Sequence, residues 1–333
     1  MRRKSCLLLF VALSAAFSVD AQNGNRKGPK VLLISIDGLR PDYVTQADKH
    51  GLRIPNLRRF LADGAYATGV HGVLPTVTYP SHTTMITGVS PAKHGIFDNH
   101  PFDPLDKNQN GWTWYAEDIR VPTLWDAASA AGLVTANVHW PVSVGARVNY
   151  NLPQIWRAGN EEDRKLLRAL ATPGLQAEIE KNFEPYPDGI DESITGDERR
   201  TRFAIRLLEM KKPEFMTVYL TALDTEEHDT GPFSPTSLAI LERIDALIGA
   251  LRSAAEKLSG GHAVVCVVSD HGFVHNDKDL NLDVAFREAG LIQYDAKDKA
   301  ISWQAVPWSA GGVGPIYLKD PSDAAVRDRK SVV

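Results

Sequence analysis

Carboxylates, imidazoles and one hydroxyl-rich segment stand out in this sequence as groups that could carry out chemistry. Asp37 ends an apolar run, Asp224 and His228 are separated by three residues, and Asp270 is followed directly by His271. The segment Leu74-Pro75-Thr76-Val77-Thr78-Tyr79-Pro80-Ser81-His82 places hydroxyl groups at the predicted start of a helix. Asp and His are natural zinc ligands, and coordination to a divalent cation favours ionisation of a hydroxyl. The pattern therefore indicates metal-activated nucleophilic chemistry.

The surrounding elements are expected to bring these groups together. Apolar, β-rich runs cover 31–36, 133–138, 215–221 and 263–268, and helical patterns cover 54–63, 121–131, 161–171, 197–211 and 234–258. This alternation indicates an α/β fold with a largely parallel central sheet, flanked by helices on both faces. The Asp and His groups follow three of the runs, and the carboxyl ends of parallel strands meet at one edge of a sheet. Cys266, inside the last run, is expected to be a small buried hydrophobe.

Composition and the N-terminal residues limit the kind of protein. The 333 residues are 43% hydrophobic and 23% charged with a net charge of −4, and no basic run predicts binding of polymeric nucleic acid. Arg2, Arg3 and Lys4 precede an apolar run over 7–17 and small residues up to Ala21. This pattern predicts a signal peptide over residues 1–21, too short to span a membrane, and one domain over 22–333. The expected location is secreted or periplasmic.

Several motifs together resemble one known family. They are Ile36-Asp37-Gly38, the block from Pro75 to His82, Asn99, Asp224-x-x-x-His228-x-x-Gly231-Pro232 and Ser269-Asp270-His271-Gly272. In order and spacing, from about residue 30 to residue 275, they resemble the nucleotide pyrophosphatase/phosphodiesterase family of the alkaline phosphatase superfamily. The resemblance implies an alkaline phosphatase-like fold and a small-molecule phosphodiester or nucleotide substrate.

The resemblance also implies two zinc ions and a threonine nucleophile. Thr78 would be the nucleophile and would hold one zinc ion together with Asp37, Asp270 and His271. The second zinc ion would belong to a separate pair of ligands, Asp224 and His228. Attack by Thr78 would give a phospho-threonine intermediate that water then hydrolyses.

Three further residues receive substrate-binding roles by resemblance. Asn99 matches an amide that donates to a phosphate oxygen, and this gives it a catalytic role as well. Tyr79 and Tyr219 match aromatic positions that sandwich a nucleobase or another leaving-side group, although either ring could simply pack inside the protein. Thr76 is expected to be structural, and His82, His94, His100 and His139 are expected to be packing or surface groups.

The C-terminal end departs from the family pattern. The family has one more histidine for the second zinc ion, whereas this sequence has none after His275. We therefore expect the C-terminal part, with the last strands and that ligand, to be missing and the second zinc site to be incomplete. The leading hypothesis is a secreted zinc-dependent phosphodiesterase or nucleotide pyrophosphatase. The alternatives are a phosphonate or phosphomonoester hydrolase with the same metal centre, or an inactive truncated remnant.

Overall fold

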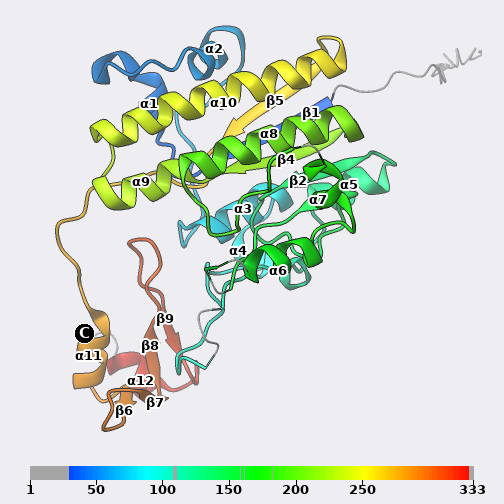
Figure 1. Cartoon of the computed structure of the whole chain (residues 1–333). Coiled ribbons are helices and arrows are strands. Elements are labelled where there is room, and N and C mark those ends of the chain that lie inside the picture. The colour runs from blue at the N-terminus through cyan, green and yellow to red at the C-terminus, as the bar shows by residue number, and fades with distance from the viewer. Residues whose placement is uncertain (1–29, 108–110, 158, 161, 182, 330–333) are drawn as a thin grey trace, which may run out of the picture.

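A parallel sheet forms the centre of the protein (Figure 1). The computed structural model describes residues 30–107, 111–157, 159–160, 162–181 and 183–329, and within them this sheet has five strands in the order β3-β2-β4-β1-β5. The strands are β1 (Lys30–Ile36), β2 (Thr135–Val138), β3 (Tyr150–Leu152), β4 (Phe215–Leu220) and β5 (Ala263–Val268), and every pairing among them is parallel. The predicted α/β fold with a largely parallel sheet is confirmed.

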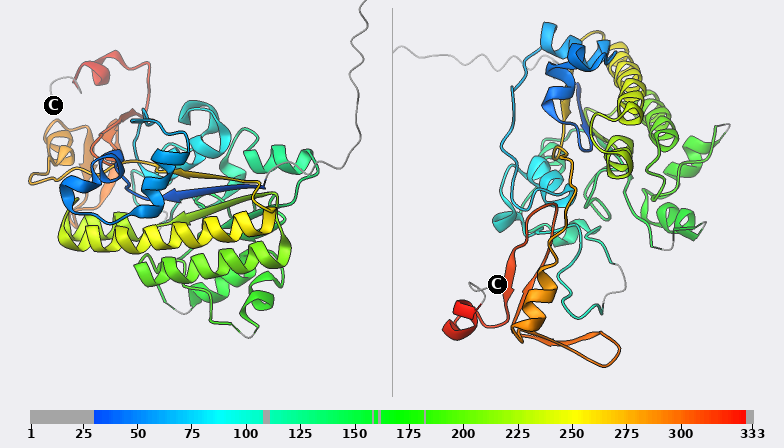
Figure 2. Two further views of the ribbon diagram at one scale, coloured as in Figure 1. Left: turned by 90° about the horizontal axis from the view of Figure 1, so that it is seen from above. Right: turned by 90° about the vertical axis from the view of Figure 1, so that its left-hand side faces the viewer.

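Helices cover both faces of this sheet, as predicted. The longest helices, α8 and α10, pack against each other on one face, whereas α3 and α5 lie on the other (Figures 1 and 2). The α-helices are α1 (Pro41–Thr45), α2 (Pro55–Asp63), α3 (Thr78–Thr87), α4 (Pro91–His94), α5 (Leu124–Ala130), α6 (Glu162–Leu170), α7 (Leu175–Glu180), α8 (Ile194–Lys211), α9 (Ala222–Thr230), α10 (Pro235–Ser259), α11 (Leu282–Glu288) and α12 (Ala324–Arg329). The described residues also contain two short 3₁₀ helices, η1 (Ala47–His50) and η2 (Ala116–Asp118).

Alternation along β1 explains how the two faces are filled. Leu32, Ile34 and Ile36 are buried in the core that includes α8 and α10. Leu33 points the other way and packs with side chains of α3 and α5, and Ser35 on the same face bonds to His82 of α3. Because β1 lies between β4 and β5, its carboxyl end lies between the ends of these two strands.

The edge strand β5 is less buried than its apolar sequence predicted. Its residues Ala263, Val265 and Val267 pack on the main core, but Val264 and Cys266 are exposed on the opposite face. The prediction that Cys266 is buried is therefore wrong. The physical reason is that β5 pairs with β1 alone and that its outer face has no covering helix within the described residues.

Residues from α11 onwards form a small unit with its own hydrophobic core. It contains the antiparallel pairs β6 (Ile292–Tyr294) with β7 (Ala300–Trp303) and β8 (Ala305–Pro307) with β9 (Ile316–Leu318). This unit is a lobe beside the main body (Figure 2). The ring of Phe102 stacks on Tyr317 with 4.4 Å between centroids, and a Cβ added to Gly311 would lie 2.6 Å from Val77 Cγ1. The β8–β9 turn thus lies against the segment that leads into α3.

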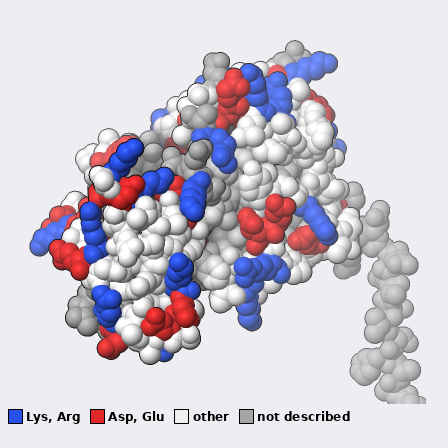
Figure 3. Space-filling model, turned by 90° about the horizontal axis from the view of Figure 1, so that it is seen from below, with Lys and Arg blue, Asp and Glu red and all other residues white. Residues whose placement is uncertain are grey.

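Membrane spans, the predicted signal peptide and the surface charge concern the chain's exterior and its N-terminus. None of the helices within the described residues is both long and apolar enough to cross a membrane. The predicted signal peptide, residues 1–21, lies outside the described residues. On the face shown in Figure 3, basic and acidic side chains are interspersed.

Candidate active site

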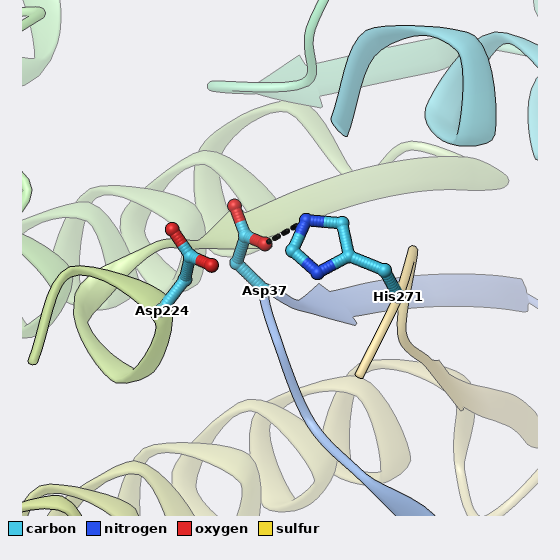
Figure 4. A group of neighbouring side chains, drawn as sticks. All are labelled: Asp37, Asp224 and His271. Carbon is cyan, nitrogen blue, oxygen red and sulfur yellow. Dashed lines mark ion pairs between the residues drawn. The ribbon is translucent and has the colours of Figure 1, made fainter. Parts of the chain in front are cut away.

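Three side chains from distant parts of the sequence meet at the carboxyl edge of the sheet. Asp37 follows β1, Asp224 is in the first turn of α9, and His271 lies just beyond β5 (Figure 4). Asp37 Oδ1 lies 3.2 Å from His271 Nε2, and potential ligand atoms of the three residues all lie within 4.8 Å of one another. The prediction that the strand ends bring these groups together is confirmed for these residues.

The predicted nucleophile and a second carboxylate join the same group. Thr78 is the first residue of α3, and its Oγ1 lies 3.5 Å from His271 Nε2. The Oδ2 atom of Asp270 lies 3.4 Å from the same nitrogen. Thr78, Asp37 and Asp270 thus surround Nε2 of His271. Together with His271 they are the four residues that the resemblance assigned to one metal ion.

Asp224 and His228 form a neighbouring pair on α9. Their side chains lie on one face of the helix with His228 Nε2 3.4 Å from Asp224 Oδ2. The bond to Asp224 raises the pKa of His228. The His228 side chain is 67% exposed, whereas Asp224 is 17% exposed and faces Asp37. The structure therefore places His228 at the exposed side of the site, and Asp224 between His228 and Asp37.

The residues present fit a divalent cation. Three buried carboxylate oxygens, Asp37 Oδ1, Asp224 Oδ1 and Asp270 Oδ2, have no hydrogen-bond partner among the described residues. Burial, followed by repulsion from Asp224 and then Asp270, raises the pKa of Asp37 well above its ordinary value. A bound cation would satisfy these oxygens and offset the repulsion. Carboxylate oxygens with imidazole nitrogens are a donor set that suits zinc.

A glycine allows this close approach of the chain segments. Gly38 has a φ of +72°, and an added Cβ would lie 2.8 Å from Glu227 Oε2 and 3.3 Å from the Cα of Asp224. Its backbone N–H lies 3.4 Å from Asp270 Oδ1. Only glycine combines this φ with so little space, which explains the Asp-Gly pair after β1.

Asn99 lies beside the start of α3. Its Oδ1 accepts a 2.8 Å bond from the backbone N–H of Tyr79, in the first turn of α3. Since the oxygen is engaged in this bond, the amide nitrogen is the group of Asn99 that could donate to a ligand. The predicted catalytic amide is therefore adjacent to the predicted nucleophile.

Tyr79 and Tyr219 do not form the expected clamp in this structure. Both rings are buried, with exposures of 0% and 1%. The hydroxyl of Tyr79 donates a 3.0 Å bond to Gln154 Oε1, and that of Tyr219 donates a short bond to Asp37 Oδ2. Rings with no exposed face cannot stack on a base, so the structure gives Tyr219 a different position, behind a carboxylate of the candidate metal site.

His82 is the site residue whose contacts sequence reasoning missed. It is fully buried, as expected of a packing group, and its Nδ1 donates a 2.8 Å bond to the carbonyl oxygen of Thr78. The same Nδ1 lies 3.5 Å from Asp270 Oδ2, and Nε2 accepts a 2.9 Å bond from the Ser35 hydroxyl. Since a carbonyl can only accept, Nδ1 carries the proton. The sequence feature that could have pointed to a role in the site was the position of His82 inside the block from Pro75 to His82.

Two glutamates near the cluster, the half-buried Glu192 and the buried Glu227, were also missed. Burial, together with smaller contributions that include repulsion from Asp224, raises the pKa of Glu192 and of Glu227 to about 7. Glu227 accepts a bond from the Tyr43 hydroxyl at 2.5 Å. The only sequence signal for Glu227 was its place directly before His228.

His94, His100, His139 and Thr76 have contacts that fit the structural roles expected of them. His94 and His139 are fully buried, and His100 is half-buried against Trp112. Thr76 Oγ1 donates a 2.8 Å bond to the carbonyl of Val73, as expected for a structural residue.

The fold and the carboxylate–imidazole–threonine cluster together define an alkaline phosphatase-like domain. A family model, type I phosphodiesterase / nucleotide pyrophosphatase, matches residues 31–331, and the chain belongs to this family. The suspected resemblance is thus confirmed.

Relatives and solved structures agree with this assignment. The chain is 27% identical over 258 residues to ectonucleotide pyrophosphatase/phosphodiesterase family member 3 of Mus musculus. The aligned region covers 73% of this chain and 25% of that relative. It is 26% identical over 283 residues to bis(5'-adenosyl)-triphosphatase ENPP4 of Pongo abelii, covering 84% and 55%. The chain therefore spans about a quarter to about half of these relatives.

The structural similarity concerns the fold. An inactive form of murine ectonucleotide pyrophosphatase/phosphodiesterase 5, in complex with AMP, matches with a TM-score of 0.60 and 21% identity. The match covers 90% of this chain and 69% of the other. The alkaline phosphatase-like fold of the chain follows from it.

Proposed function

We propose that this protein is a zinc-dependent phosphodiesterase or nucleotide pyrophosphatase that uses Thr78 as its nucleophile. The observation that carries the proposal is the position of Thr78 Oγ1, 3.5 Å from His271 Nε2 and beside the orphaned oxygens of Asp37 and Asp270. Family membership and relatives named as nucleotide pyrophosphatases support the same reaction class.

Six side chains are proposed to hold two zinc ions. Asp37, Thr78, Asp270 and His271 would hold one, and Asp224 and His228 would belong to the other. When bound, the metal would supply charge neutralisation and favour the ionised form of a coordinated hydroxyl.

The chain's own residues then prepare the attack. The fixed start of α3 presents the Thr78 hydroxyl to the phosphorus, and the N-terminal end of the helix favours the negative charge of the phosphate. The Asn99 amide, held through Tyr79 N–H, donates to a non-bridging oxygen as charge develops. This step breaks the bond to the leaving group and gives a phospho-threonine at Thr78 whose phosphorus still carries the other substituent of the substrate. Water then breaks the bond to Thr78, which releases the phosphate product and restores the hydroxyl.

The substrate proposed is a small phosphodiester or nucleotide. A relative is named a bis(5'-adenosyl)-triphosphatase, and a neighbour of the same fold is in complex with AMP. The leading test substrate is therefore a chromogenic nucleotide diester, assayed beside a chromogenic phosphomonoester.

A pair of threonine variants tests the nucleophile. Thr78→Ala should lower nucleotide-diester turnover by at least about 1,000-fold while the fold remains. Thr76→Ala is the matched control, because that hydroxyl bonds only to the Val73 carbonyl. Turnover by Thr78→Ala at the rate of the control would overturn the assignment.

We also propose that the protein is exported, with residues 1–21 as the signal peptide. The basis is the sequence pattern of those residues, which lie outside the described part. N-terminal sequencing of the protein from the extracellular or periplasmic fraction should begin at Gln22.

A further inference from the structure

The helix that carries Asp224 and His228 has an unusual N-terminus. The residue before α9 is Thr221, and its side chain makes no capping bond to the helix. Instead, the Thr221 hydroxyl accepts a 3.2 Å bond from Arg200 Nη1. The first backbone N–H groups of α9 therefore need another acceptor.

That acceptor is Asp197, from the neighbouring helix α8. Its carboxylate accepts bonds from Thr221 N–H at 3.0 Å and from Ala222 N–H at 2.9 Å. Figure 1 shows α8 and α9 side by side, in agreement with their packing. Asp224 is only two residues beyond Ala222, so the carboxylate fixes the turn of helix in which this predicted metal ligand lies.

A buried cation completes the arrangement. Arg200 donates a 2.9 Å bond from Nη1 to Asp197 Oδ1, and its Nη2 donates a short bond to the carbonyl of Asp191. Asp197 and Arg200 are both 0% exposed. One buried ion pair thus joins the loop before α8, the end of β4 and the start of α9.

We propose that Asp197, held by Arg200, is a positioning residue for metal binding by Asp224. The inference rests on the proposed metal centre. Metal ligands must be held to within about 0.5 Å, and partners behind the ligands typically change metal affinity by about 10- to 100-fold. An external cap that sets the rotation and the height of α9 acts on both its Asp and its His side chains.

The chain provides a matched control in Asp245. This buried aspartate of α10 accepts bonds from the backbone N–H groups of Asn56 at 3.2 Å and Leu57 at 2.7 Å. It therefore caps α2 from outside as Asp197 caps α9. Helix α2 carries none of the proposed ligands, so a purely structural role predicts the same result for both aspartates.

The test measures zinc affinity of the full chain by competition with a chromophoric chelator. Asp197→Asn places an NH₂ group against one of the backbone N–H donors, and we expect about 10- to 100-fold weaker zinc binding. Asp245→Asn should change zinc affinity by less than about threefold. Combining Asp197→Asn with Asp224→Asn should cost less affinity than the sum of the two single losses, because part of the effect of Asp197 acts through Asp224.

A second variant covers the loss of the charge pair. Asp197→Asn leaves Arg200 without its carboxylate. Combining it with Arg200→Met removes this unpaired charge, while the weakened cap, with an amide in place of the carboxylate, is kept. Unchanged zinc affinity in either folded variant, or an equal loss in Asp245→Asn, would overturn the inference. A wild-type chain that binds no zinc would overturn the proposed metal centre itself, and the inference with it.

Discussion

Replacing Tyr219 by phenylalanine separates two roles for this residue. The variant keeps the ring that the family resemblance assigned to a base clamp, and it removes only the hydroxyl that donates to Asp37 Oδ2. Burial raises the pKa of Asp37, and the bond from Tyr219 acts in the opposite direction, towards the ionised carboxylate. Loss of the hydroxyl should therefore weaken metal binding and leave substrate stacking unaffected.

The size of the effect follows from the kind of bond that is lost. A hydrogen bond to a charged group contributes about 1.5–3 kcal/mol. At about 1.4 kcal/mol for each factor of ten, zinc affinity should fall by about 10- to 100-fold. The ring volume is nearly unchanged, so the fold should persist.

The assay compares zinc affinity in three chains by chelator competition. Tyr79→Phe is the control, since it also removes a buried phenolic hydroxyl, but one that bonds to Gln154. Its zinc affinity should match that of the wild type. If Tyr219→Phe binds zinc within about threefold of the wild type while Tyr219→Leu loses nucleotide affinity, the residue acts through its ring and the structural reasoning fails.

Three further predictions concern stability and exposure. Burial lowers the pKa of His94 from 6.5 to about 4, and its Nδ1 accepts a hydrogen bond from Ile96 N–H. The contribution of neutral His94 to the free energy of unfolding should therefore be complete above pH 6.5 and should be lost as the pH falls from 6.5 to about 4. In denaturation experiments, His94→Gln should show a smaller loss of stability over this pH range than the wild type. Cys266 is exposed, so a water-soluble thiol reagent should label the native protein, and labelling that requires denaturant would contradict the structure. Gly189→Ala should destabilise by about 1–3 kcal/mol in urea, because the new Cβ would lie 1.8 Å from the Ile155 carbonyl oxygen; an unchanged midpoint would argue against this packing.

The convergence of the site could be predicted from the sequence because it depends on a general rule. Asp37, Asp270 and His271 follow apolar runs, and the carboxyl ends of parallel strands meet at one edge. The spacing of Asp224 and His228 likewise gave their common helix face. These inferences need only the element type and its approximate end.

The missed features depend on partners that periodicity does not reveal. Alternation shows on which face Tyr219 lies, but not that its hydroxyl reaches Asp37. An apolar run does not distinguish a central strand from an edge strand, which explains the wrong prediction for Cys266. The cap on α9 comes from Asp197 in another helix, so it leaves no local signature.

The small unit after residue 281 was not recognised for a related reason. Its strands are three or four residues long, which is too short for a clear period of two. Its core is built from a few side chains, among them Phe286 and Ile292, that are spread over its whole length.

The wide spacing of the site along the chain has a consequence for folding. Gly38 N–H and Asp270 Oδ1, beside the cluster, are 232 residues apart in sequence, and they approach only once β1 has paired with β4 and β5. The unfolded chain therefore offers no comparable site. A cation whose free concentration is about a hundred times its dissociation constant would stabilise the native state by about 2.7 kcal/mol. Metal supply would then set the fraction of chains that unfold and become accessible to proteases, so starvation for metal would shorten the lifetime of the protein as well as stop its reaction.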